Sequence, residues 1–439
     1  MIHYNTHMKI AILGAGFSGL TAGYELAKAG YQVEIFEKAA QVAGAAGGFK
    51  RPGWDWYLDY TYHHCFTNEH EILDLAKEIG FANFLKMRPE TASLYLNKQQ
   101  PDNNDNPLFQ YLFGQHTKSY KLDSAHDLLR FERLPLLDRL RTGLVLALLK
   151  FGPKLNYYDK TLAKDFLTTT MGRKANQELW EPLFLKKFQH YYHQINLGFF
   201  WARLRRTPDL SYPPGGYQAL ANQLALKTKK LGAKIYLKTE IKNIKLDKKQ
   251  FILTGPSQQF RANKLINTLQ TPLFLKIGGM ILPTSYRRRL QKIEYLGAHN
   301  IIFASRQKVL PKTYWLSLAT PASRQNPGSN YMVAVQQTNF VPAKHYHHQH
   351  LLYLATYTNK PKLFTLKDKK LAEEYRIIQQ AYLKYGQPLY TPEFVKNKPD
   401  YLTPVPNLYF ANMELTYPYD RGTNQAVRCG QQVAQKMIK

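Results

Sequence analysis

Three glycines between a short apolar run and a helical stretch constrain this chain more than any other feature. Residues 9–13 suit a buried parallel strand, and they lead directly into Gly14, Gly16 and Gly19. In this spacing the first glycine permits a tight turn and the second lets the backbone approach a pyrophosphate. The third allows the helix to pack closely on the strand. The pattern therefore predicts a dinucleotide-binding turn between a strand and a helix.

The elements that follow agree with this interpretation. Residues 20–30 predict a helix that ends at Gly30, and residues 32–36 predict a second strand that ends at Glu37. The N-terminus of such a helix offers unpaired N–H groups and the positive end of its dipole to phosphates. Glu37 is placed to accept hydrogen bonds from a ribose diol. We also count Phe17 and Ser18, inside the turn, among the expected cofactor contacts.

Composition narrows the class of protein. The 439 residues allow two or three domains, and 44% apolar residues are too many for a disordered chain. Cys65 and Cys429 are the only cysteines, which excludes a disulfide scaffold and a cysteine-ligated zinc or iron–sulfur site. No run approaches the roughly 20 apolar residues of a membrane-spanning helix. Residues 1–7 lack the pattern of a secretory signal, and we expect them to be a disordered lead-in to a strand that begins near Met8. A cytoplasmic protein is the expectation.

The charge balance is strongly basic. Lys and Arg number 60 against 31 Asp and Glu, a net charge of +29, and the lysines are densest between residues 227 and 249. Such a surface attracts nucleic acid or anionic lipid headgroups, or is simply well solvated. We favour the solvated surface and expect no nucleic-acid partner, because no zinc-finger spacing or RNA-binding motif accompanies the lysines.

The segment after Glu37 narrows the choice of dinucleotide. Lys38 comes next, and then a glycine-rich segment that contains Gly44, Gly47 and Gly48. This order resembles the extended fingerprint of the amine oxidase, phytoene desaturase and protoporphyrinogen oxidase superfamily, in which the glycine-rich segment lies along FAD. The superfamily usually has two adjacent glycines where this chain has only Gly44, with the Gly47–Gly48 pair just beyond. The resemblance implies FAD as the cofactor, contacted by these residues.

The resemblance extends along most of the chain. Residues 212–220 resemble the Pro-x-Gly-Gly segment that opens a helix, and residues 232–244 predict the strand after it, which implies that Ile241 lies near the adenine. Residues 265–269 resemble the return of the chain to the cofactor domain. Residues 408–412 and 417–434 resemble the closing flavin motif, in which a helix N-terminus stabilises negative charge on the flavin. The contacts that this motif implies are Asn412, Arg421, Gly422, Thr423 and Asn424, with Asn412 at a position where the superfamily usually has glycine.

Two further features of the sequence bear on the electron acceptor and on how the flavin is attached. No second glycine fingerprint follows the first, so we expect no NAD(P)H domain, and reoxidation by O2, a quinone or another acceptor. Cys429 lies within the predicted closing helix, where we interpret it as a small packing residue. We therefore expect non-covalent FAD.

Four residues are candidates for a direct part in the chemistry: His63, His64, Lys187 and Arg203. A histidine near the flavin would serve as acid or base, and the alternative is a structural, hydrogen-bonded histidine. Adjacent side chains on an extended backbone point in opposite directions, so at most one of the two is expected to face the flavin. Residues 180–188 and 199–206 resemble one subgroup that is also similar to UDP-galactopyranose mutases. There Lys187 and Arg203 would bind a diphosphate or carboxylate, or they belong to a solvated basic helix face.

Two other stretches allow more than one interpretation. Residues 134–151 predict the most apolar helix, which would rest on a membrane surface, line the entry to an apolar pocket, or be buried. The histidine-rich residues 345–350 suggest a metal site, but no acidic residues accompany them, so we interpret them as a surface loop and expect no metal.

The sequence thus predicts an α/β protein. A discontinuous Rossmann-type FAD-binding domain is expected from residues 1–90, 208–275 and 400–439. An α+β substrate domain would combine a helical lobe, residues 91–207, with an antiparallel sheet, residues 276–399, in which residues 314–318, 333–339 and 351–356 are expected strands that form the floor of the substrate pocket.

For function we expect an FAD-dependent oxidoreductase. It would dehydrogenate or desaturate an apolar, isoprenoid-like or amine-type small molecule by hydride transfer to flavin N5. The alternatives are a sugar-nucleotide mutase of the UDP-galactopyranose mutase type, which uses reduced FAD without net redox change, and a flavin-binding protein without turnover. Besides a small-molecule substrate, the sequence allows one other partner, an anionic membrane surface that the protein would contact at the inner face of a membrane. The oligomeric state stays open.

Overall fold

A sheet of five parallel strands organises one end of the protein. The computed structural model describes residues 8–438, and it orders these strands as β10, β2, β1, β14 and β20. Their bounds are Lys9–Leu13 for β1, Gln32–Phe36 for β2, Lys234–Tyr236 for β10, Lys264–Asn267 for β14 and Leu408–Phe410 for β20. The sheet therefore joins three segments that lie far apart in the sequence. The predicted lead-in, residues 1–7, lies outside the described residues.

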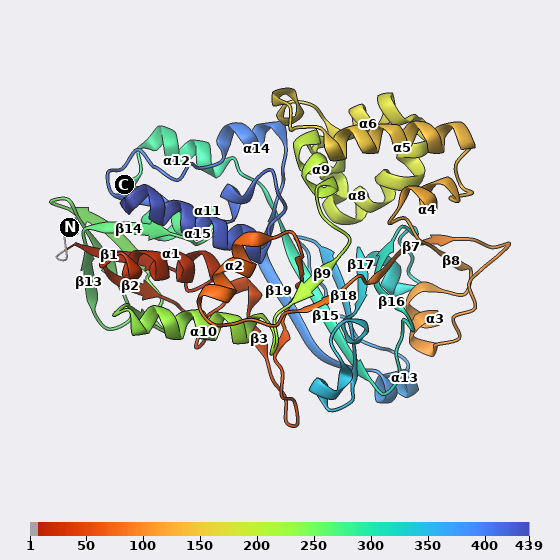
Figure 1. Ribbon diagram of the computed structural model, residues 1–439, viewed down its shortest axis with the longest axis horizontal. Coiled ribbons are helices and arrows are strands. Elements are labelled where there is room, and N and C mark those ends of the chain that lie inside the picture. Colours follow the sequence, from red (N-terminus) through yellow and green to blue (C-terminus); the bar gives the residue numbers. More distant parts are fainter. Residues whose placement is uncertain (1–7, 439) are drawn as a thin grey trace.

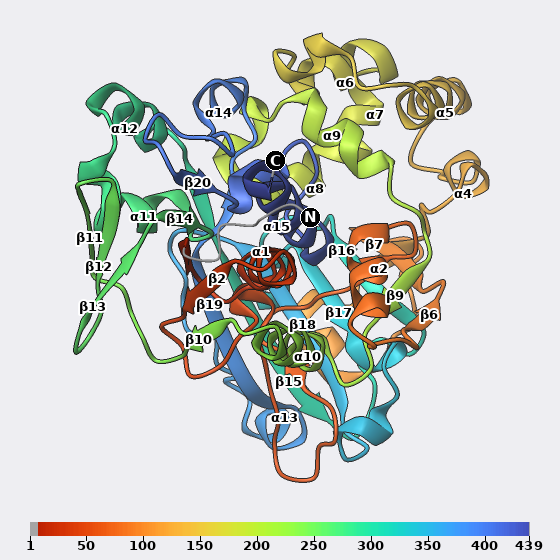
Figure 2. The same ribbon diagram turned by 60° about the vertical axis from the view of Figure 1, so that its left-hand side comes forward.

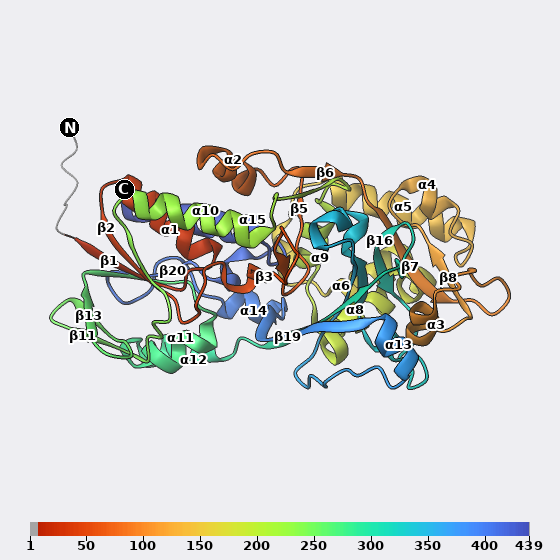
Figure 3. The same ribbon diagram turned by 90° about the horizontal axis from the view of Figure 1, so that it is seen from below.

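Three helices cover one face of this sheet (Figure 3). They are α1 (Phe17–Lys28), α10 (Tyr217–Lys230) and α15 (Thr423–Ile438), and α2 (His70–Glu78) packs against α15. Because α1 lies between α10 and α15, all three segments of the sheet contribute to the same layer (Figure 2).

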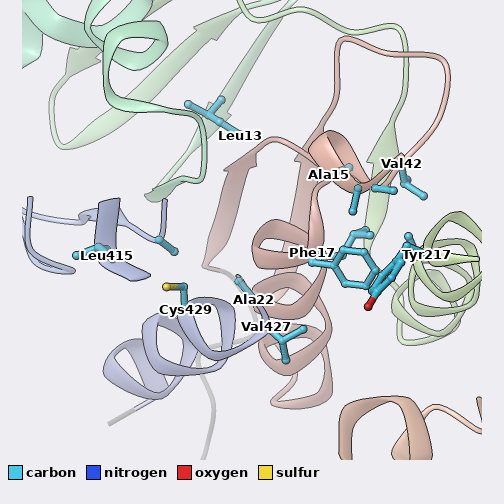
Figure 4. Close-up of a cluster of buried hydrophobic side chains, with 14 of the residues drawn as sticks. Leu13, Ala15, Phe17, Ala22, Val42, Tyr217, Leu415, Val427 and Cys429 are labelled. Atoms are coloured by element: carbon cyan, nitrogen blue, oxygen red, sulfur yellow. The ribbon is translucent and has the colours of Figure 1, made fainter. Parts of the chain in front are cut away.

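The core of this layer forms around α1 (Figure 4). The ring of Phe17 meets that of Tyr217 edge-on, with ring centroids 6.2 Å apart. On the other side α15 approaches very closely, because a Cβ at Gly430 would lie 2.5 Å from the Ser18 carbonyl oxygen. The start of the chain and its end are therefore held together by direct packing.

The opposite face of the sheet carries an antiparallel hairpin sheet and two helices (Figure 3). Their bounds are Asn243–Asp247 for β11, Gln250–Thr254 for β12, Gln259–Ala262 for β13, Thr271–Gly278 for α11 and Thr284–Gln291 for α12. The single strand predicted over residues 232–244 is wrong. Lys238 has a φ of +52°, and its N–H donates to the Ala39 carbonyl, so the chain turns and the two strands β10 and β11 belong to different sheets.

A sheet of seven strands forms the other half of the protein (Figure 1). Its order is β19, β15, β18, β17, β16, β7 and β8, and every pairing is antiparallel except that of β16 with β7. The bounds are Glu90–Leu96 for β7, Thr117–Tyr120 for β8, Tyr295–Ser305 for β15, Thr313–Leu318 for β16, Val333–Gln336 for β17, His350–Tyr357 for β18 and Arg376–Pro388 for β19. The predicted strands at residues 314–318, 333–339 and 351–356 correspond to β16, β17 and β18, although β17 ends at Gln336.

The helical lobe lies above this sheet at upper right in Figure 1. Its helices are α4 (Ala125–Leu129), α5 (Leu136–Phe151), α6 (Ala163–Met171), α7 (Arg173–Ala175), α8 (Glu181–Phe188) and α9 (Leu197–Leu204). The predicted lobe, residues 91–207, is not wholly helical. Its first part supplies β7 and β8 to the large sheet, where Leu94 and Ala92 are buried in the sheet core.

Short elements connect these bodies. They are β3 (Gly48–Phe49), β4 (Leu58–Asp59), β5 (Cys65–Phe66), β6 (Leu85–Met87), β9 (Leu210–Tyr212), α3 (Pro107–Phe113), α13 (Lys369–Glu374) and α14 (Pro392–Asn397). The α/β fold class predicted from the sequence is confirmed; the domain boundaries stay predictions.

Candidate active site

A large cavity runs between the five-stranded sheet, the seven-stranded sheet and the helical lobe. Its volume is about 1250 Å³, enough for a dinucleotide and a small molecule together. At one end it is lined by the carboxyl end of β1 and the first turn of α1, and at the other by α8, α9 and strands of the large sheet. The cavity thus joins the predicted cofactor segments to the predicted substrate segments.

The turn between β1 and α1 forms one wall of the cavity. Gly14 has a φ of +95°, which favours glycine, and its N–H donates to the Phe36 carbonyl over 2.8 Å. Gly19 does not line the cavity; a Cβ there would lie 2.0 Å from the Gly14 oxygen, so this glycine permits close packing. Gly16 does line it and leaves space that a side chain would fill. No side chain caps α1, so its first N–H groups are available to an anion.

Glu37 is held at the carboxyl end of β2. Its Oε2 accepts from the Ala15 N–H and its Oε1 from the Ala39 N–H, both over 2.9 Å. Glu37, Lys38 and Ile241 all line the cavity, so the expected ribose and adenine contacts lie together.

The glycine-rich segment divides into two parts. Gly44 lines the cavity, with a φ of +56° that brings its backbone against Gly16. Gly47 and Gly48 do not line it; the Gly48 N–H instead donates to Oε1 of Gln218, which ties this segment to α10.

The closing segment approaches the turn from the other side. Ser18 Oγ donates to the Ala411 carbonyl over 2.5 Å, so the two ends of the chain meet at the cavity. Asn412, Arg421, Gly422 and Thr423 line the cavity, together with Phe17 and Ser18 of the turn. Asn424 does not; its Nδ2 donates to Glu71 and its Oδ1 accepts from the Ile72 N–H, which fixes α2 against α15.

These residues fit a flavin dinucleotide. Among the described residues, buried polar atoms without a hydrogen-bond partner include Asn412 Oδ1 and Arg421 Nε, both from cavity-lining residues. A Cβ at Gly422 would meet nothing closer than 3.9 Å, so the N-terminus of α15 is open to a ligand. Unpartnered polar atoms and empty glycine positions are what a bound polar cofactor would use.

Both candidate histidines line the cavity, on different sides. The ring of His63 lies 5.5 Å from that of Tyr217 in α10, and the ring of His64 lies 5.8 Å from that of Trp315 in β16. Burial, with the nearby charge of Arg421, lowers the pKa of His63 to about 4. Burial and the charge of Arg206 lower the pKa of His64 to about 3. Both histidines are therefore neutral at pH 7.

The tautomer of His63 follows from its partner. Its Nδ1 lies 2.6 Å from the Thr61 carbonyl oxygen, which only accepts, so Nδ1 carries the proton and Nε2 keeps a lone pair. His63 thus presents an acceptor at neutral pH.

Lys187 and Arg203 meet at one carboxylate. Lys187 Nζ lies 2.6 Å and Arg203 Nη1 2.9 Å from Asp420 Oδ2, and Arg206 lies 3.9 Å from the same atom. Burial would raise the pKa of Asp420, but the charges of Lys187, Arg203, Arg206 and Arg421 together hold this pKa well below its ordinary value. Burial lowers the pKa of Lys187, because Asp420 offsets the desolvation only in part. All five groups line the cavity.

Sequence reasoning missed Asp420 as a site residue. Asp420 stands 233 residues from Lys187 and 217 from Arg203, so no local spacing connects them. The only local signal was the position of Asp420 directly before the expected flavin contacts Arg421 and Gly422. Aromatic side chains also line this end: Trp180, Phe184, Phe188, Phe199, Phe200 and Trp315.

In the histidine-rich loop, His345 contacts Asp55 and Trp56. His345 Nδ1 lies 3.0 Å from Asp55 Oδ2, and its ring stacks on Trp56 with centroids 4.0 Å apart. Within residues 8–438 no three histidine, cysteine or acidic side chains gather as a metal site would require.

Comparison with known proteins shows which relatives and which family this chain resembles. The chain is similar to a 4,4'-diapophytoene desaturase of Staphylococcus aureus, with 26% identity over 264 residues. The alignment covers 55% of this chain and 50% of that protein. The curated relatives are thus matched over half of their length or less. An oxidoreductase from Methanosarcina mazei shares the fold with a TM-score of 0.69 at 16% identity, covering 98% of this chain and 100% of that one. A putrescine oxidase bound to putrescine also gives a TM-score of 0.69, at 15% identity, covering 98% and 99%. Residues 17–438 match the family described as flavin containing amine oxidoreductase, and the chain therefore belongs to that family.

Proposed function

We propose that this protein is an oxidoreductase that binds FAD non-covalently and dehydrogenates or desaturates a largely apolar small molecule. One observation carries the proposal: a single cavity extends from the phosphate-binding turn at Gly16 to a chamber walled by aromatic side chains. A flavin-binding protein without turnover has no need of that second space.

Several features support FAD held without a covalent bond. The cavity has room beyond Gly16 for a pyrophosphate and places Glu37 and Ile241 at its nucleotide end. Cys65 and Cys429 are buried and do not line the cavity, so neither thiol is available to the cofactor.

The chain's own residues would orient and shield the reaction. When bound, the flavin supplies the hydride acceptor at its N5. The N-terminus of α15 at Gly422 and Thr423 favours negative charge beside it. The aromatic walls exclude water from the substrate, and His63 offers Nε2 as a proton acceptor near the reacting centre.

The charge of the chamber favours desaturation over amine oxidation. The putrescine oxidase neighbour is described as bound to putrescine, a cationic diamine at neutral pH. In this chain Lys187, Arg203 and Arg206 face the chamber, and they would repel a protonated amine. An apolar substrate, as in the desaturase relative, meets no such penalty.

The same arginines favour one second candidate, a sugar-nucleotide mutase that uses reduced FAD. Its diphosphate substrate would pair with Arg203 and Arg206. A mutase requires its flavin to be reduced beforehand and consumes no electron acceptor, whereas an oxidoreductase bleaches its flavin with substrate alone.

Anaerobic stopped-flow spectroscopy separates these candidates. The oxidised holoprotein is mixed with acyclic isoprenoids, amines and amino acids, and the dithionite-reduced protein with sugar nucleotides. Loss of the oxidised flavin spectrum with an isoprenoid supports the proposal. Interconversion of a sugar nucleotide by the reduced protein alone would overturn it in favour of the mutase.

A further inference from the structure

Basic side chains gather in the chamber beside the expected flavin site. Lys187, Arg203 and Arg206 line it, and Asp420 is the carboxylate that pairs with all three. Glu69 and Asp123 also line the cavity, where Glu69 Oε2 accepts from the Phe66 N–H and Asp123 Oδ1 accepts from the Thr91 hydroxyl. Among the described residues Asp420 is the one carboxylate within 4 Å of these three basic groups, so they share a single ionic partner in a low-dielectric space.

The cations are also positioned rather than loosely solvated. Lys187 Nζ lies 4.9 Å from the centre of the Phe199 ring, and the Arg206 guanidinium lies 5.1 Å from that of Phe66. Cations fixed over aromatic rings and aimed at one cavity form a receptor for an anion with an apolar body attached.

We propose that the chamber binds the acidic group of an amphipathic substrate, a carboxylate or a phosphate ester, at Arg203, Arg206 and Lys187. The apolar body of that substrate then lies along Phe199, Phe200 and Trp315 toward the flavin. This inference rests on the proposed function, since it names the substrate class for the same chamber. Arg421 lies beside the expected flavin contacts and is left to the cofactor.

Isothermal titration calorimetry of the holoprotein tests this binding without requiring turnover. The probes are dodecyl phosphate, dodecanoate and dodecanol, each below its aggregation concentration. At least one of the two anions should bind tenfold or more tightly than dodecanol, and the preferred anion identifies phosphate or carboxylate as the head group. Equal affinity for all three probes would overturn the proposal.

Variants on one helix end provide the matched control. Arg206→Met and Arg203→Met should each weaken the anionic probes at least tenfold and leave dodecanol unchanged. Arg205→Met should bind like the wild type, because Arg205 does not line the cavity and stacks on Trp201 instead. Wild-type affinity in both chamber variants, with flavin content and thermal midpoint retained, contradicts the proposal.

The two proposals fail in different ways. Anion preference without flavin bleaching by any substrate would leave the chamber assignment standing and remove the oxidoreductase. Bleaching of the flavin by a neutral polyene, without a preference for anionic probes, would support the oxidoreductase and remove the chamber assignment.

An independent observation concerns the outer face of α5. Six large apolar side chains along this helix are at least half exposed, and helical geometry places five of them within one narrow stripe. The stripe is Leu137, Leu140, Leu144, Leu148 and Phe151, with exposed fractions of 80%, 53%, 64%, 65% and 80%. The opposite face, with Thr142 and Leu149, is buried in the helical lobe.

The surroundings of this stripe are basic. Residues 130–160 contain seven Lys and Arg against three Asp and Glu. Among the described residues no helix is long and apolar enough to cross a bilayer. An apolar stripe beside cations suits a helix that lies in the plane of an anionic membrane surface.

We infer that α5 docks this protein on an anionic bilayer. Co-sedimentation with vesicles of phosphatidylcholine, with and without phosphatidylglycerol, measures the binding. The wild type should partition at least tenfold more strongly to the anionic vesicles, and Leu144→Glu with Leu148→Glu should reduce that partition at least tenfold. Leu363→Glu, at a 79% exposed leucine outside the helical lobe, is the matched control and should bind like the wild type.

Two results would overturn this inference. Unchanged sedimentation of the double variant removes α5 from membrane binding. A wild type that self-associates in solution and becomes monomeric in the double variant would show instead that the stripe covers a second copy of the chain.

Discussion

At the scale of single residues, two glycines of the turn between β1 and α1 matter because they have no side chain. Gly16 has an ordinary backbone conformation, and the space beside it opens into the cavity. Gly19 instead faces the Gly14 carbonyl. The two positions therefore predict different defects when a side chain is added.

Gly16→Leu should remove the flavin while the protein remains folded, because the new side chain occupies the space expected for the pyrophosphate. Flavin absorbance per protein should fall more than tenfold, with the far-UV circular dichroism unchanged. Gly143→Leu, on α5 away from the cavity, should keep its flavin. Normal flavin content in Gly16→Leu contradicts the assignment of the turn.

Gly19→Ala should destabilise the whole protein, because its Cβ would lie 2.0 Å from a backbone oxygen that cannot move aside. A loss of about 1–3 kcal/mol is typical of such overpacking. Thermal unfolding measures it, and a midpoint equal to that of the wild type would show that the turn relaxes freely.

The lowered pKa of His64 predicts a specific loss of stability in acid. Burial lowers the pKa of His64 to about 3, so between its ordinary pKa of 6.5 and that value the unfolded chain binds a proton that the folded chain does not. Stability therefore falls as the pH drops below about 6.5, by about 1.4 kcal/mol per pH unit for such a group. His64→Gln should show a smaller fall in thermal midpoint between pH 7 and pH 5 than the wild type. An identical pH dependence would mean that His64 is not kept neutral.

At the scale of elements, the contact between α1 and α15 joins the two ends of the chain. Gly430→Leu should push these helices apart, since even a Cβ there would lie 2.5 Å from the Ser18 carbonyl oxygen. Both the thermal midpoint and the flavin content should fall. Gln435→Leu, at an exposed position of the same helix, serves as control, and equal behaviour of the two variants would contradict the role of this contact.

Sequence reasoning succeeded where local pattern decides the element. The run from residue 9 to Glu37 alternates strand, glycine turn, helix and strand with the correct periods, and β1, α1 and β2 follow it closely. It failed where tertiary pairing decides. Every residue of β15 is buried, yet Gly297, His299 and Asn300 interrupt its apolar pattern, and the partner β19 is rich in Gln and Tyr. β15 is stabilised by long-range pairing with β18, and its own sequence carries no local signal that predicts this pairing.

At the scale of the whole molecule, the cavity exists because three sequence segments converge on it. The sequence indicated which segments approach a cofactor, since each carries its own motif. The charge cluster at Asp420 could not be predicted from the sequence, because only the folded chain brings Lys187 and Arg203 to that carboxylate. The cofactor end was therefore largely predictable, and the substrate end was not.

The most direct test is a crystal structure of the purified, flavin-loaded protein. The account predicts electron density for FAD in the cavity, with its pyrophosphate at Gly14–Ser18 and its ring system at Gly422 and Thr423, next to the chamber of Lys187 and Arg206. Flavin bound elsewhere, or a cavity closed by side chains between these two ends, would contradict it.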